Sequence, residues 1–126
     1  MRTLLTGIGV VIAALGAISH AHGQKATEQY IPLGQSPGVS QKHTSIGEIA
    51  DVDQRGQTVT IAEPAGRRTV KITAKTRIWV DRTKLKEQTL TGSFADLQQG
   101  RRVEVKYEDP GERQVADWVK VEVAQR

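Results

Sequence analysis

The chain has 126 residues, of which 25% are charged, with a formal net charge of +4 and no cysteine. This length fits one domain with a modest core, and the lack of cysteine excludes disulfide bonds and cysteine-based catalysis. Charges alternate in sign along the chain, as in "RRVEVKYEDPGER" and "KVEVAQR". Such mixing favours a solvated surface over a nucleic-acid interface, so no nucleic-acid partner is expected.

The first 23 residues have the pattern of a secretory signal peptide. Arg2 is followed by an apolar run from Leu4 to Ile18, and the small residues after it permit cleavage after Ala21 or after Gly23. The alternative is an uncleaved anchor, but this run of 15 residues is shorter than the roughly 20 that span a bilayer. We prefer cleavage after Gly23, which predicts a periplasmic or secreted bacterial protein. Contact with the membrane is expected only through this segment, if it stays attached.

Residues 24–43 are expected to form an extended N-terminal arm. Pro32 and Pro37 each remove a backbone donor and bias the preceding residue towards extended backbone, which disfavours a helix or a central strand. Tyr30, Ile31 and Leu33 lie close together, and exposed apolar residues usually cover something. We therefore expect the Tyr-Ile-Pro-Leu part to pack on the following domain or on a partner. The alternative is a disordered tail.

Alternation of apolar and polar residues predicts a three-stranded meander over residues 44–52, 57–63 and 67–73. The connecting segments "DQRG" and "PAGR" both contain the glycine that is typical of tight turns. In the first strand, Ile46, Ala50 and Val52 are expected on the buried face. Gly47 interrupts the pattern and is expected to let the strand bend.

The second half of the chain is less regular. Residues 77–80 predict a short strand that holds Trp79, residues 81–92 read as a loop, and residues 93–100 predict one or two helical turns. Ser93 is a candidate N-cap for these turns, with Phe94 and Leu97 pointing inward.

Two further strands follow, over residues 101–109 and 113–123. Val103, Val105 and Tyr107 share the inner face of the first, and Trp118 and Lys120 share the outer face of the second. Three strands, a connection with a short helix and two more strands is the order of the oligonucleotide/oligosaccharide-binding (OB) fold. The predicted fold over residues 44–126 is therefore all-β: a small closed OB-like β-barrel of five to six strands with one short helix.

No catalytic or metal centre can be argued from the residues. His43 is the one histidine that remains after cleavage at Gly23, and no cysteine accompanies it. Asp51 and Asp53 begin like a calcium loop, but Ala62 occupies the position of the bidentate glutamate. Ser36 lacks both the strand–turn–helix setting and the base of a nucleophile. The sequence thus predicts a protein that is not an enzyme and has no cofactor.

Two kinds of binding remain open. The first is protein interaction in the cell envelope, for which the candidate contact residues are Tyr30, Ile31, Leu33, Trp79 and Trp118. The second is an OB-fold ligand site for an oligosaccharide or anionic polymer, which would combine Trp79 and Trp118 with basic residues at strand ends: Arg67, Arg68, Arg101 and Arg102. The expected partner is accordingly an envelope protein or a glycan.

The layout from residue 44 onward also resembles a bacterial family of small exported domains of unknown function. The matching stretches are Gly47-Glu48-Ile49 with Val52-Asp53, "QTVTIAEPAGRRTVKITAKTRI", "GSFADLQQGRRVEV" and "VADWVKVEV". The resemblance spans about 80 residues. It implies an OB-like β-barrel outside the cytoplasm and brings no catalytic or binding residues.

Overall fold

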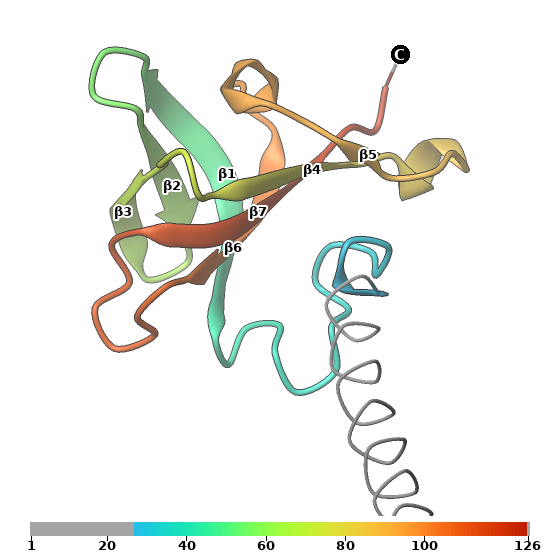
Figure 1. The fold of residues 1–126 in the computed structure, drawn as a ribbon, viewed down its shortest axis with the longest axis horizontal. Helices are drawn as coiled ribbons and strands as arrows, with labels where there is room; N and C mark the ends of the chain where they lie inside the picture. Colours follow the sequence, from blue (N-terminus) through green and yellow to red (C-terminus); the bar gives the residue numbers. More distant parts are fainter. Residues whose placement is uncertain (1–26, 126) are drawn as a thin grey trace, which may run out of the picture.

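The computed structural model describes residues 27–125. One sheet contains seven strands: β1 (Thr44–Asp53), β2 (Thr58–Glu63), β3 (Gly66–Lys71), β4 (Arg77–Asp81), β5 (Leu90–Thr91), β6 (Arg102–Tyr107) and β7 (Ala116–Glu122) (Figure 1). Two single 3-10 turns, η1 (Thr83–Leu85) and η2 (Phe94–Asp96), lie between β4 and β6. The predicted signal segment, residues 1–23, lies outside the described residues. Within the described range, no helix has the length and apolar character needed to span a bilayer.

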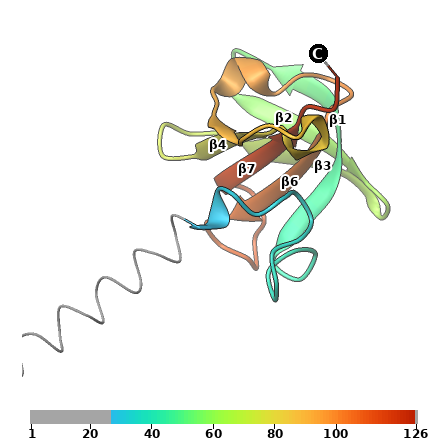
Figure 2. The same cartoon turned by 90° about the vertical axis from the view of Figure 1, so that its right-hand side faces the viewer.

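The strand order is β3-β2-β1-β6-β7-β4-β5, and all neighbouring pairs are antiparallel except β4 with β7. The end of β3 returns to the start of β7, where Lys71 forms an isolated parallel bridge with Val115. Strands β1, β2, β3, β6 and β7 therefore curve into a partly open barrel with the OB-like order (Figures 1 and 2). The all-β, OB-like class is confirmed.

Two details differ from the sequence-based expectation. The sheet does not close into a continuous ring, because β3 and β7 meet through that single bridge. The structure also has one strand more than expected. This strand, β5, lies inside residues 81–92, which were expected to form a loop, and its two residues are too few to show an alternating pattern.

The interior of the barrel holds one apolar cluster. Its buried members are Ile49, Val59, Ile61, Val70, Ile72, Ile78, Val80, Leu97, Val103, Val105, Tyr107, Ala116, Val119 and Val121. The expected inner face of β1 was wrong for Ile46 and Ala50, since Ile49 occupies the core instead. A register shift between Ile49 and Asp51 changes the alternation, so that Val52 still packs against the cluster.

The short helix is confirmed as the single turn η2. Asp96 Oδ2 accepts a hydrogen bond from Ser93 N at 2.8 Å, which completes a capping box. Leu97 is buried and Phe94 packs against the core, as expected.

Tyr107 carries the one phenol of the core cluster. Its hydroxyl donates a hydrogen bond to Ser45 Oγ at 2.7 Å. Burial raises the pKa of Tyr107, and the hydrogen bond to Ser45 opposes this rise.

Candidate functional site

The outer face of β1, β6, β7 and β4, opposite the core, carries polar and aromatic side chains in cross-strand rows. In one row Trp79 on β4 pairs with Lys120 on β7, Lys120 pairs with Glu104 on β6, and Glu104 pairs with Ile46 on β1. The next row contains Arg77, Trp118, Lys106 and Thr44. Residues in such rows are close neighbours, so this face can act as a unit.

The two tryptophans of these rows lie against each other. The ring centroids of Trp79 and Trp118 are 5.5 Å apart with an interplanar angle of 34°. The Arg77 guanidinium lies 5.9 Å from the centre of Trp79, and Lys120 Nζ lies 4.8 Å from the centre of Trp118. Each indole thus carries a cation on its face, which favours one fixed arrangement of the four side chains.

Lys120 is 1% exposed although it lies on the outer face. Its Nζ donates to Glu28 Oε1 at 2.9 Å, to the Ile31 carbonyl at 2.9 Å and to Ser36 Oγ at 3.3 Å. An ammonium has three protons to donate, so its hydrogen-bonding capacity is filled. All three acceptors come from the arm, here defined as the described residues 27–43. Burial of this charge therefore depends on the arm.

Two buried carboxylates hold the backbone of the arm in the same way. Glu104 is fully buried and accepts hydrogen bonds from Gly34 N at 2.8 Å and from Thr44 Oγ1 at 2.8 Å. Asp81 accepts one from Leu33 N at 2.7 Å through Oδ2, while its Oδ1 accepts from Thr83. Hydrogen bonds from backbone N–H groups to carboxylates are among the stronger ones in proteins.

The arm itself consists of consecutive turns and not of the extended chain that the prolines favour. Its hydrogen bonds include Ile31 N to Glu28 O at 3.2 Å, Gln35 N to Pro32 O at 3.0 Å and His43 N to Val39 O at 2.9 Å. The anchors to β4, β6 and β7 bend it across the sheet, and Figure 2 shows it lying over β6 and β7. Positive φ angles of 82° at Gly34 and 72° at Gly38 permit this path.

A groove lies between the arm and the β4–β7 pair. Its lining residues are Glu28, Val39, Arg77, Trp79, Lys106, Asp117 and Trp118, and its volume is about 190 Å³. Asp117 accepts hydrogen bonds from Arg77 Nη2 and from Lys106 Nζ, both at 3.4 Å. The lining thus combines two indoles with two cations and two carboxylates. The groove can hold an apolar side chain and offers both hydrogen-bond donors and hydrogen-bond acceptors around it.

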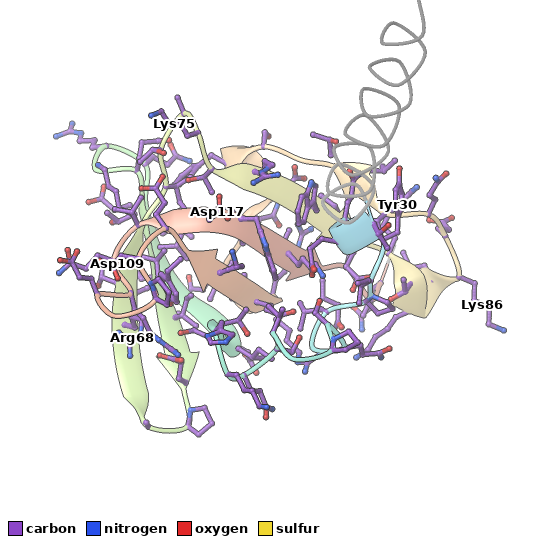
Figure 3. All side chains as sticks on the ribbon, turned by 60° about the horizontal axis from the view of Figure 1, so that its bottom comes forward. Tyr30, Arg68, Lys75, Lys86, Asp109 and Asp117 are labelled. Carbon is purple, nitrogen blue, oxygen red and sulfur yellow. The ribbon has the colours of Figure 1, made fainter. Side chains whose placement is uncertain are left out.

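The structure distributes the predicted contact residues unevenly. Trp79 and Trp118 line the groove, with 5% and 3% of their surfaces exposed. Leu33 is 4% exposed and Ile31 is half-buried, whereas Tyr30 is 52% exposed. In Figure 3, Tyr30 lies beside the first turn of the arm, and Asp117 lies on β7.

The basic strand ends do not join this groove. Arg68 on β3 donates to Glu63 Oε2 at 2.9 Å, and Arg102 on β6 pairs with Glu122 at 3.5 Å. Figure 3 shows Arg68 well away from Tyr30 and Asp117. Arg101 and Arg102 line a different, open depression with Glu48, Glu122 and the C-terminal residues.

Sequence reasoning missed Glu28, Glu104 and Lys120 as members of the site. The alternation placed Glu104 and Lys120 on the outer face, and an outer lysine or glutamate is ordinarily solvated. The signal that was available is Glu28, the one charged residue of the segment "EQYIPLGQSPGVS". A single charge in a segment expected to pack needs a partner of opposite sign.

The geometry of the described residues does not support a metal site, a calcium loop or a serine nucleophile. No group of three or more His, Cys, Asp or Glu side chains among them could hold a metal ion. His43 is exposed, and Asp53 accepts hydrogen bonds from Arg55 N and Gly56 N at 3.1 Å each, as in an ordinary turn. Ser36 donates to Glu28 Oε1 and accepts from Lys120. Its hydroxyl is therefore part of the arm's anchor.

Comparisons with known proteins leave the family open. No protein-family model matches the chain, and no curated protein matches it. Two solved structures of CusF are similar in part. A Cu(II) structure of a CusF variant from Escherichia coli has 14% identity and a TM-score of 0.43, and the alignment covers 62% of this chain and 88% of that one. For the structure of Ag(I)CusF, the identity is 15%, the TM-score 0.43, and the coverage 62% and 93%.

Proposed function

We propose that this protein is an exported, non-enzymatic β-barrel module that binds a partner protein in the cell envelope. The contact is the groove beside Trp79 and Trp118, and the partner segment inserts one large apolar side chain between the indoles and the arm. Export rests on the signal pattern of residues 1–23.

The observation that carries this proposal is the composition of the groove. Protein interfaces are enriched in tryptophan and arginine at their centres, with charged groups at the rim. Here Trp79 and Trp118 form the apolar part, and Arg77, Lys106 and Asp117 supply the charged groups. A volume of about 190 Å³ matches a single side chain and is below the roughly 300 Å³ at which small-molecule sites begin.

The polar groups of this face support binding over catalysis. The carboxylates and the ammonium of the outer face are held by one another and by the arm: Glu104 by Gly34, Asp81 by Leu33, and Lys120 by Glu28. A general acid or base needs a titrating group that faces a reacting molecule. Among the described residues, no His or Cys lines the groove.

Site-specific photocrosslinking tests the proposal. Benzoylphenylalanine replaces Lys106 at the groove in the full chain, expressed in cells, and replaces Lys75, an exposed residue of the β3–β4 connection, in the control. We expect one defined envelope protein to be crosslinked from position 106 and not from position 75. Asp117→Lys should abolish this adduct, whereas Glu112→Lys in the exposed β6–β7 loop should leave it unchanged.

The oligosaccharide or polyanion alternative gives a different result. The groove volume of about 190 Å³ is below the roughly 300 Å³ at which small-molecule sites begin, so it is too small for an oligosaccharide or a polymer. Titration of the protein with glycans and polyanions should therefore leave tryptophan fluorescence unchanged. Saturable quenching together with no protein adduct at position 106 would replace the proposal with the ligand-binding alternative.

A further inference from the structure

The arm forms part of the groove and is itself held by few, specific anchors. Glu28 and Val39 of the arm line the groove together with residues of β4, β6 and β7. We infer that the arm is a movable part of the groove, so that arm docking and partner binding form one coupled equilibrium. This inference rests on the proposed binding function and adds its regulation: the partner binds the docked arm, and release of the arm dismantles the site.

The arm can leave without disrupting the barrel. Within the described residues, none of positions 27–43 pairs with a strand of the sheet. Its backbone hydrogen bonds are mostly local turns. Residues 27–36 are bonded to the barrel through the side chains of Asp81, Glu104 and Lys120, and Leu33 is buried against it. The remaining bonds lie next to β1, where Gln41 N donates to Thr44 and the Lys42 carbonyl accepts from Arg113. Opening the arm therefore leaves every strand ladder intact. Under this condition the arm can open at a lower free energy than global unfolding requires.

The position of a hinge follows from the backbone. Ser36 is the last arm residue bonded to Lys120, and the next hydrogen bonds to the barrel, from Gln41 N to Thr44 and from Arg113 to the Lys42 carbonyl, lie beside β1. The segment between them contains Gly38, with a φ angle of 72°, and ends at Gln41, with a φ angle of 71°. Val39 and Ser40 both donate to the Ser36 carbonyl, at 3.1 and 3.0 Å. Rotation of this turn would lift residues 27–36 while Thr44 keeps its place in the sheet.

Lys120 is the central anchor and Glu28 links it to the groove. Glu28 Oε1 accepts from Lys120 Nζ at 2.9 Å, and the same residue lines the groove. A partner that occupies the groove contacts the docked arm and is lost when the arm opens. By thermodynamic linkage the partner must then hold the arm closed by the same factor by which docking strengthens partner binding.

Native-state amide hydrogen exchange on the full chain tests the arm without any partner. The reporters are the amides of Leu33 and Gly34, which donate to Asp81 and Glu104. In the wild type we expect these amides to exchange faster than the core amides of β6 and β7. Glu28→Gln keeps the shape but removes the anionic partner of Lys120, and should speed exchange at Leu33 and Gly34 about ten- to a hundredfold, with the β6 and β7 amides unchanged.

The matched control is Glu63→Gln, which removes an acid paired with Arg68 at 2.9 Å on the other side of the barrel. It should leave the Leu33 and Gly34 amides at wild-type rates. Lys120→Met provides a second opening variant: it keeps the bulk of the side chain and removes the charge, and the same two amides should speed up.

The inference is overturned if the Leu33 and Gly34 amides exchange together with the core amides in the wild type and in both variants, because the arm would then open only on global unfolding. It is also overturned if a crosslinked partner speeds exchange at these amides. Failure of the crosslinking at position 106 would instead refute the proposed function, since the exchange rates of the wild type and of the variants are compared without a partner.

Discussion

Replacement of Gly47 by alanine tests how closely β1 and β2 approach each other where the first strand bends. A Cβ at this position would lie 2.2 Å from the Ala62 carbonyl oxygen and 2.9 Å from Ile61 Cγ2. The first distance of 2.2 Å is about 1 Å less than the shortest favourable C···O approach of about 3.3 Å. Because the contact is with backbone, β1 must move away from β2, at the pairs Glu48↔Ala62 and Ile49↔Ile61.

The expected cost follows from three contributions. Overpacking costs about 1–3 kcal/mol, and weakening one or two ladder hydrogen bonds costs about 1 kcal/mol each. Alanine also lowers the conformational entropy of the unfolded chain relative to glycine, which offsets about 0.4–1 kcal/mol of this cost. Gly47→Ala should therefore lower the free energy of unfolding by about 1–4.6 kcal/mol, which corresponds to a fall in Tm of about 4–37 °C for a domain of this size.

Urea and thermal unfolding, followed by circular dichroism and tryptophan fluorescence, measure this effect. Gly111→Ala is the control, because that glycine lies in an exposed turn where the nearest atom to an added Cβ is a flexible side-chain oxygen at 3.3 Å. It should change stability by less than about 0.5 kcal/mol. If Gly47→Ala were equally harmless, the close approach of β1 to β2 would be wrong.

Three further predictions concern the core and the arm. Because burial raises the pKa of Tyr107 above the unfolded value near 10, its contribution to stability is complete below about pH 10. That contribution falls as the pH rises towards the folded pKa, and Tyr107→Phe should flatten this alkaline decline in urea melts at pH 9–11. Ser45→Ala leaves the buried Tyr107 hydroxyl without its acceptor and should cost about 1–3 kcal/mol in the same assay at pH 7; a cost near zero would contradict the hydrogen bond. Leu33→Ala should cost about 2–3 kcal/mol, whereas Tyr30→Ala, at an exposed position, should stay within about 0.5 kcal/mol; equal costs would contradict the docked arm.

Much of the barrel could be predicted because its strands follow a local rule. Val59 and Ile61 alternate with polar residues, and so do Val103 and Val105, and all four are in the core. The rule failed at β1, where Ile49 replaces Ile46 inside. A bulge changes the alternation by one residue, and its position is set by pairing with β2, which a single strand does not encode.

The candidate site was less predictable, because its members are far apart in the chain. Trp79 and Trp118 were identified as candidates, and the parallel pairing of β4 with β7 brings them together. The burial of Lys120 depends on Glu28, which lies 92 positions away. Neither residue alone shows a pattern that predicts this contact, since each is polar in a setting where polar residues are common.

The two ends of the sheet also limit how this protein can associate. The outermost strand on one side, β5, has two residues, which is too short to pair with an incoming strand. On the other side, β3 carries Arg67, Arg68 and Lys71, and their like charges repel a second copy of the same edge. Concentrated protein should therefore resist growth by strand addition. The proposed partner is therefore expected to contact side chains on a sheet face, where recognition does not extend the sheet into a polymer.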